Sequence, residues 1–137
     1  MNNERIKFRG KKEDGGWTIG YYEERISFVC ETAHTFIWEQ KSQCLRKVVR
    51  DTVGQFIGMQ DKNGVDIYEG DIVEVDGKNK KVVQFVPEMG AFCAINISEY
   101  RGEYERYFWN YLDRIWWKEE LTEVIGNVYD NPEMVEG

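Results

Sequence analysis

Short segments of alternating polar and apolar residues, each ended by a turn, most constrain what this chain can fold into. Residues 51–75 read DTVGQFIGMQDKNGVDIYEGDIVEV and contain three such segments, separated by QDKNG and EGD. The pair Asn63-Gly64 suits a type I′ turn, because both central residues of that turn need a positive φ. Gly70-Asp71 repeats similar turn chemistry. Turns spaced about 8–12 residues apart predict a mainly β fold, either a small barrel or a sandwich.

The N-terminal part of the chain has the same texture. RIKFRG alternates, and WTIGYY, RISFVC and HTFIWE are rich in the aromatic and β-branched residues that pack well on a pleated sheet. The 137 residues fit one domain with a real hydrophobic core. We therefore expect a single domain over residues 1–137, with a β-rich part at 1–50 and a barrel part at 51–137.

The pattern changes near the C-terminus. In EYRGEYERYFWNYLDRIWWKEELTEV, apolar residues fall at 104, 108, 111, 112, 115 and 116. This spacing is helical and predicts a short helix at about 102–120. Two aromatic-rich strands are the competing interpretation, since tyrosine, phenylalanine and tryptophan also suit sheets.

Eight aromatic residues lie between positions 100 and 117, more than a small core can easily bury. Tryptophan and tyrosine supply much of the contact energy at protein interfaces. The segment therefore predicts a homo-oligomer in which several of these side chains contact another copy of the chain. Alternatively, they cap one open end of the barrel. The expected interface residues are Tyr104, Phe108, Trp109, Tyr111, Trp116 and Trp117.

Four acidic residues crowd one stretch and raise the question of a metal or catalytic site. They are Asp61, Asp66, Glu69 and Asp71. An EF-hand loop that began at Asp61 would need a ligand at position 5, glycine at 6 and glutamate at 12. The chain has Val65, Asp66 and Ile72 there, so the match fails. Turn chemistry explains the acids better, since an aspartate can accept a hydrogen bond from the backbone two residues on.

Other signs of chemistry are few. The single histidine, His34, lies in a β-rich segment, and the chain has no CxxC, HExxH, GxSxG or P-loop motif. A Cys30–His34 dyad would span ~13 Å in an extended strand, too far for direct proton transfer. We therefore do not expect an enzyme, a cofactor or a metal site.

The charge is uneven along the chain. Residues 1–50 carry a net charge of +3 and residues 51–137 a net charge of −10, which gives −7 overall. An acidic protein repels phosphate backbones, so nucleic acid is not an expected partner. The odd count of three cysteines, Cys30, Cys44 and Cys93, indicates a reduced compartment. With no signal peptide and no apolar membrane segment, we expect a cytoplasmic protein.

Three blocks of the sequence resemble the YopX family, small proteins of bacteriophages and of prophages in Gram-positive bacteria. They are IKFRG at 6–10, DTVGQFIGMQDKNGVDIYEGDIVE at 51–74 and VIGNVYDNPE at 124–133. The resemblance implies a β-rich domain with an SH3-like barrel that assembles into oligomers. It implies no biochemical activity and no functional residue.

Together these features favour a prophage accessory protein that acts by protein contacts, with itself and with a host or phage protein. Two alternatives remain. The chain could be an acidic nucleic-acid mimic that occupies a host DNA-binding protein. It could also bind nucleic acid directly through the barrel, using the basic clusters at 5–12 and 41–50 together with stacking aromatic side chains.

Overall fold

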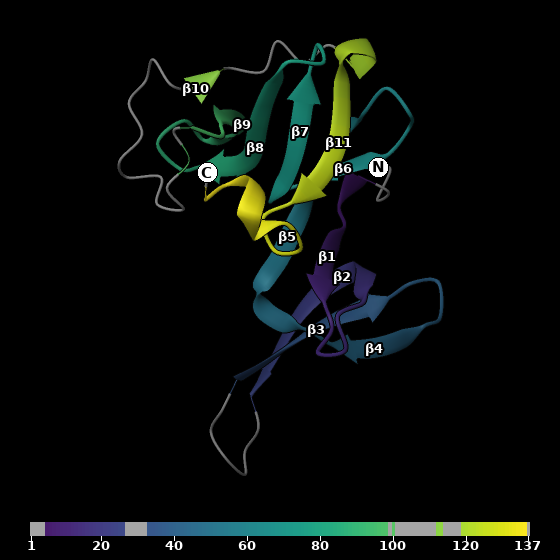
Figure 1. Ribbon diagram of the computed structural model, residues 1–137. Helices are drawn as coiled ribbons and strands as arrows, with labels where there is room; N and C mark the ends of the chain where they lie inside the picture. The colour runs from purple at the N-terminus through teal and green to yellow at the C-terminus, as the bar shows by residue number, and fades with distance from the viewer. Residues whose placement is uncertain (1–4, 27–32, 99, 101–111, 114–118, 137) are drawn as a thin grey trace. The chain divides into compact units, whose positions relative to one another are not determined.

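A computed structural model of the chain describes residues 5–26, 33–98, 100, 112–113 and 119–136. Almost all of the elements in these residues are antiparallel strands, which confirms the predicted mainly β fold (Figure 1). The chain divides into two compact units, Met1–Phe56 and Ile57–Gly137. The strands are β1 (Phe8–Lys11), β2 (Trp17–Ile26), β3 (Ala33–Glu39), β4 (Cys44–Lys47), β5 (Val49–Gln60), β6 (Asp66–Tyr68), β7 (Asp71–Val75), β8 (Asn79–Val86), β9 (Ala91–Asn96), β10 (Leu112–Asp113) and β11 (Thr122–Asn127).

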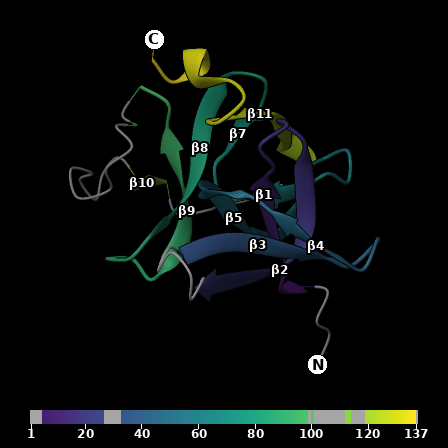
Figure 2. The same cartoon turned by 90° about the horizontal axis from the view of Figure 1, so that it is seen from below.

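The first unit is a sheet of strands in the order β4-β3-β2-β1-β5. Figure 2 shows β2 and β3 running side by side, and their register pairs Tyr21 with Trp38. The side chains of Ile37 and Val48 are buried. A Cβ atom at Gly10 would lie 2.9 Å from the side chain of Val48, so this position on β1 needs a glycine to admit the valine.

The second unit contains the end of β5, which pairs with β6, and a five-stranded sheet in the order β10-β9-β8-β7-β11. One interior cluster consists of Ile67, Val73 and Val83, against which the partly buried Val124 packs. A second cluster consists of Val86, Cys93 and Ile95. Burying these apolar side chains stabilises the unit by about 25 cal/mol for each Å² removed from water.

The helix predicted at 102–120 is wrong where the structure describes this segment. Leu112 and Asp113 form the short strand β10, which pairs with Ile95 and Ala94 of β9. The backbone of these two residues pairs with a neighbouring strand. Large aromatic and aliphatic residues, which are common in this part of the sequence, suit strands as well as helices. Glu119–Leu121 forms a single 3₁₀ turn, η4, which leads directly into β11. The rest of the predicted helix, 102–111 and 114–118, lies outside the described residues.

The described strands do not form a closed barrel, so the predicted SH3-like barrel is not confirmed. Closure requires the two edge strands of a sheet to pair with each other. In the five-stranded sheet, β10 pairs with β9 and β11 pairs with β7. No pairing among the described residues joins β10 to β11, so this sheet stays open.

The turn at Asn63-Gly64 lies where the sequence predicts it, but it is not of type I′. The N–H of Gly64 donates to the carbonyl of Asp61 at 3.0 Å, so that Lys62 and Asn63 are the central residues. Gly64 has a φ of 78°, whereas Asn63 does not take a positive φ. The N–H of Asp61 then donates to the carbonyl of Val65. One left-handed residue after the turn is enough to close the hairpin, as in common three-residue loops.

We expect Gly64→Val to lower the free energy of unfolding by roughly 1–2 kcal/mol, because a left-handed conformation strains any residue with a Cβ atom, and a β-branched one most. A Cβ atom here would meet nothing within 4 Å, so the loss comes from the backbone and not from a clash. Chemical denaturation measures it. Gly64→Asn is the matched control, since asparagine tolerates this conformation. Equal losses in the two variants would show that φ is not the cause.

Candidate functional site

Asp61 is a structural residue that ties the hairpin loop to the last strand of its unit. Its side chain is 1% exposed. Its Oδ1 accepts hydrogen bonds from the N–H groups of Asn63 at 2.8 Å and Val65 at 2.9 Å. Its Oδ2 accepts one from the N–H of Val124 at 3.0 Å. The predicted bond to the backbone two residues on is confirmed, and the carboxylate also reaches β11.

These three donors decide the ionisation of Asp61. Burial would raise the pKa of its carboxyl, but the N–H groups of Val124, Val65 and Asn63 outweigh burial, and the pKa lies below its ordinary value. The carboxylate is therefore charged at neutral pH, and its charge is directed at backbone donors.

The other three acids of this stretch also bond to the protein itself. Asp71 is buried, and its Oδ2 accepts the N–H of Tyr68 at 2.8 Å. Asp66 accepts from the side-chain amide of Gln60 at 3.0 Å. Glu69 accepts from the N–H of Phe85 at 3.1 Å. In the part of the chain that the structure describes, no three histidine, cysteine or acidic side chains converge as metal ligands.

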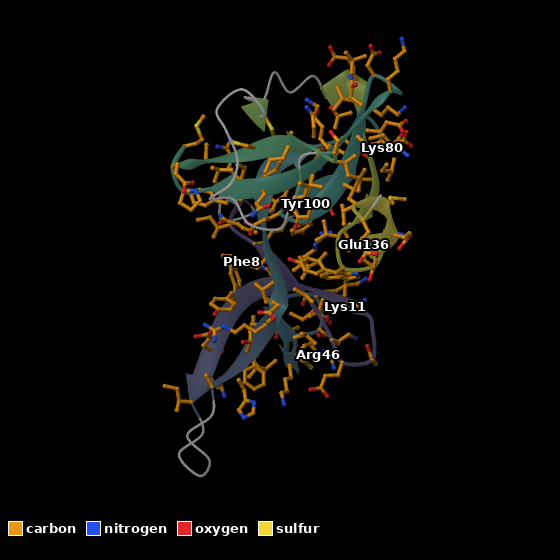
Figure 3. All side chains as sticks on the ribbon, turned by 60° about the vertical axis from the view of Figure 1, so that its left-hand side comes forward. Phe8, Lys11, Arg46, Lys80, Tyr100 and Glu136 are labelled. Atoms are coloured by element: carbon orange, nitrogen blue, oxygen red, sulfur yellow. The ribbon has the colours of Figure 1, made fainter. Side chains whose placement is uncertain are left out.

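A small pocket opens in the second unit beside Glu69. Its volume is ≈ 230 Å³. Its described lining comes from four places: the turn between β6 and β7, the middle of β8, Tyr100 after β9, and the residues that follow β11. Figure 3 shows the side chains, with the lining residue Tyr100 labelled beside the strands of this unit. The described lining residues are Glu69, Gly70, Val82, Val83, Gln84, Tyr100, Val128 and Tyr129.

The turn after β11 places Tyr129 at this pocket. The side-chain oxygen of Asn127 accepts the N–H groups of Tyr129 and Asp130, at 3.0 and 2.8 Å. The side-chain oxygen of Asn131 in turn accepts the N–H of Asn127 at 3.2 Å. On the opposite wall, a Cβ atom at Gly70 would lie 2.9 Å from the ring of Tyr129. Gly70, with a φ of 93°, makes room for that ring.

Glu69 and Gln84 give the pocket its polar character. Burial raises the pKa of the Glu69 carboxyl, while the N–H of Phe85 acts in the opposite direction. The Oε1 atom of Gln84 is buried and accepts no hydrogen bond among the described residues. Because this atom has almost no accessible surface, a ligand in the pocket does not reach it without a movement of the side chain. In the sequence Glu69 has the pattern of a turn residue, and no motif there predicts this pocket.

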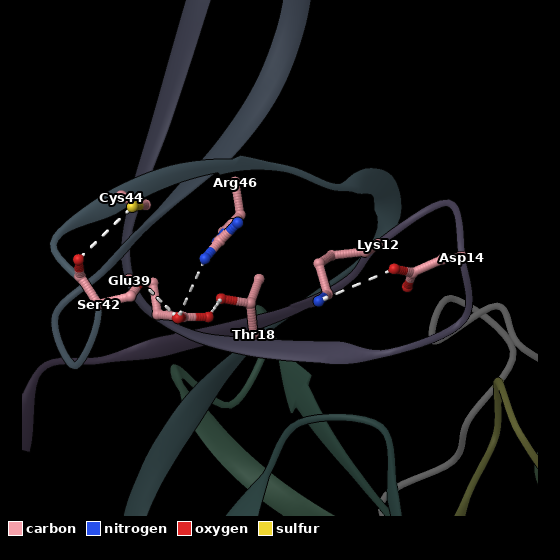
Figure 4. Close-up of polar contacts among 7 residues, drawn as sticks. All are labelled: Lys12, Asp14, Thr18, Glu39, Ser42, Cys44 and Arg46. Carbon is pink, nitrogen blue, oxygen red and sulfur yellow. Dashed lines mark hydrogen bonds and ion pairs between the residues drawn. The ribbon is translucent and has the colours of Figure 1, made fainter.

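A polar cluster in the first unit is centred on Glu39 (Figure 4). The hydroxyl groups of Thr18 and Ser42 donate to its two carboxylate oxygens at 2.5 and 2.6 Å. Arg46 lies 3.9 Å from the same carboxylate. The hydroxyl of Ser42, and next that of Thr18, lower the pKa of Glu39. The cluster fastens the turn between β3 and β4 to β2, and we assign it a structural role.

One face of the first unit's sheet carries exposed apolar side chains. Ile19, Tyr21 and Trp38 are 47%, 39% and 40% exposed. They lie on the same face, because Tyr21 pairs directly with Trp38 and Ile19 is two residues from Tyr21 along β2. We call these three residues the aromatic face. Alternating residues in WTIGYY and HTFIWE are the sequence signal that could have identified it.

The six residues predicted to form an interface, Tyr104, Phe108, Trp109, Tyr111, Trp116 and Trp117, lie outside the described residues. His34 lies on β3, where the structure gives it no role in either site. Cys44 is an exposed free thiol and Cys93 is a buried one. Within the described residues, no helix has the length and apolar content needed to cross a lipid bilayer.

Three comparisons with known proteins were made, and one of them identifies the family. A family model described as YopX protein matches residues 7–136. A search of curated proteins found no match. Among solved structures, the crystal structure of protein EF1440 from Enterococcus faecalis is similar, with 21% sequence identity and a TM-score of 0.49. That similarity covers 95% of this chain and 97% of the other.

We expect Asp61→Asn to lower the free energy of unfolding by about 1–3 kcal/mol at neutral pH, because an amide cannot accept hydrogen bonds at both of its ends. The folded-state pKa of Asp61 is lowered, so its contribution is complete above the unfolded pKa of about 3.9 and is lost as the pH falls through the folded pKa. The difference in the free energy of unfolding between wild type and variant should therefore decrease below about pH 4. Urea denaturation as a function of pH measures it, with the exposed Asp51→Asn as control. A difference in unfolding free energy that stays constant with pH would contradict a stabilising role of the ionised Asp61 carboxylate.

Proposed function

The chain belongs to the YopX protein family, and we propose that it acts as a non-enzymatic protein-interaction module that self-associates. In the setting that the resemblance implies, it is an accessory protein of a phage or prophage. The free thiols of Cys44 and Cys93 fit a reducing cytoplasm.

The observation that carries the proposal is the aromatic face. The outward face of an antiparallel sheet is ordinarily polar, because water solvates it. Here it presents Trp38, Tyr21 and Ile19, each more than a third exposed. Large apolar side chains gathered on one exposed face mark interaction sites more often than scattered ones do. Tryptophan and tyrosine are also the residues that contribute most at protein interfaces.

The aromatic segment at 104–117 supports the same role. It supplies seven further aromatic side chains within 14 positions, and six of them are the predicted interface residues. Burying them against a second copy of the chain removes their surface from water without a larger core. Closed symmetric assemblies are the common outcome when one chain pairs with itself.

We expect light scattering to give the mass of an oligomer for the wild type at tens of micromolar. The double variant Trp109→Ala, Trp116→Ala should shift toward the monomer of 16.2 kDa. The matched variant Tyr21→Thr, Trp38→Thr keeps residues that favour strands and removes the aromatic face.

These two variants separate the possible results. Loss of mass in the first variant assigns the interface to the segment at 104–117. Loss in the second alone assigns it to the aromatic face and shows that the predicted residues are wrong. A wild type that stays monomeric at this concentration would contradict the proposed self-association.

Ion pairs in the first unit argue against nucleic acid as a partner. Nucleic-acid affinity comes largely from basic side chains that neutralise phosphates. Here basic side chains lie next to acidic ones, with Lys47 3.7 Å from Glu13 and Arg50 3.3 Å from Glu24. The acidic neighbours reduce the positive potential of the base-rich segments.

We therefore expect no measurable binding to duplex DNA at about 0.15 M salt, because the overall charge of −7 opposes approach of a polyanion. Fluorescence anisotropy with a labelled duplex measures it, and a repeat at low salt serves as the control. Micromolar binding that weakens steeply with salt would show that the two basic clusters form one phosphate-binding surface.

A further inference from the structure

The walls of the Glu69 pocket are held in place by backbone hydrogen bonds. The N–H of Gly70 donates to the carbonyl of Val83 at 2.8 Å, and the N–H of Val128 donates to the carbonyl of Gly70 at 2.9 Å. The N–H of Phe85 bonds to Oε2 of Glu69. These bonds join the turn between β6 and β7 to β8 and to the residues that follow β11. A site with fixed walls loses little entropy when a ligand binds.

The described lining is rich in acceptors and has no basic side chain. Glu69 is its acidic residue, and the hydrogen bond from the N–H of Phe85 occupies Oε2, which leaves Oε1 for a donor. The buried Oε1 of Gln84 is a second acceptor without a partner among the described residues. A carboxylate or phosphate ligand would face Glu69 with like charge. A ligand with several N–H donors and a positive charge would be stabilised by the Glu69 carboxylate.

The other lining residues determine the size and the apolar character of a ligand that fits the pocket. Tyr100 and Tyr129 bring aromatic rings, and the half-buried Val128 brings apolar surface, whereas Val82 and Val83 are almost fully buried. Cations are attracted to the faces of such rings. The volume of ≈ 230 Å³ lies below the roughly 300–1,000 Å³ of sites for drug-sized ligands. The pocket therefore suits a single charged group on an apolar stem.

We propose that this pocket binds a guanidinium group, as carried by the side chain of an arginine. A guanidinium is planar, has five N–H donors and no acceptor, and stacks on aromatic rings. Its N–H donors would pair with Oε1 of Glu69, and its plane would stack on the ring of Tyr100 or Tyr129. This site goes beyond the proposed self-association and does not depend on a second copy of the chain.

Nuclear magnetic resonance with small probes tests the site directly. The probes are N-acetyl-arginine amide and its neutral isostere N-acetyl-citrulline amide, which differ in charge and in donor count but hardly in shape. The arginine probe should shift the backbone amide signals of Gly70, Gln84 and Phe85 in a saturable way. The citrulline probe should bind roughly tenfold more weakly or not at all, since a hydrogen bond to a charged group contributes about 1.5–3 kcal/mol.

Two variants assign the effect to the pocket. Glu69→Gln keeps the size of the side chain and an acceptor for Phe85, and it should weaken binding of the arginine probe roughly tenfold. Gln84→Met removes the buried acceptor at similar volume and should leave binding of the arginine probe nearly unchanged. Glu88→Gln is the control, because it makes the same charge change at an exposed position of the same unit that does not line the pocket. The amide spectrum of each variant reports whether it is folded.

The source of the guanidinium follows from a third probe, free L-arginine. Tighter binding of free arginine than of the blocked amide indicates a small metabolite, and the reverse order indicates an arginine presented by a protein. Either order supports a guanidinium site. Equal binding of the arginine and citrulline probes would overturn the proposal, as would undiminished binding in a folded Glu69→Gln variant.

Discussion

The Asp61 carboxylate is the contact on which the second unit depends most. It accepts two N–H groups of its own hairpin loop and one from Val124, 63 residues further along the chain. A buried carboxylate is costly unless donors compensate for the lost water, and three backbone donors do so here. The same carboxylate therefore closes a local turn and positions β11. The carbonyl of Thr122, which accepts the N–H of Lys62, makes a second bond at this junction.

The pocket follows from that junction. With β11 fixed, the chain leaves it through a turn that is held by Asn127 and delivers Tyr129 to the face of Gly70. Two of the blocks that carry the resemblance to the YopX family, 51–74 and 124–133, meet at this pocket. Glu69 and Gly70 belong to the block at 51–74, and Val128 and Tyr129 belong to the block at 124–133. Turn residues that look merely structural in the sequence thus also form the walls of a site.

The features that could be predicted from the sequence are those that depend on residues close together in the chain. The mainly β fold, the turn at Gly64 and the bond from the Asn63 N–H to Asp61 all follow from side chains a few positions apart. It did not predict the bond to Val124 or the approach of Tyr129 to Gly70, because these pairs are about 60 residues apart and no local rule joins them. The helix at 102–120 was wrong at Leu112 and Asp113, since helical spacing of large apolar residues does not exclude a strand when a sheet edge is available. The left-handed Gly70, next to an acid, was the one local sign of the pocket.

The two proposed contacts rest on different physical forces and can therefore be separated. Self-association through the aromatic face or the aromatic segment depends on burial of apolar surface, which salt screens little. A guanidinium in the pocket depends on the charge of Glu69, and added salt screens a partly exposed ion pair. Apolar burial also weakens on cooling, whereas a charge-assisted hydrogen bond follows no such trend. A chain that uses both forces can assemble with itself and still recognise a basic partner under conditions that alter one contact and leave the other intact.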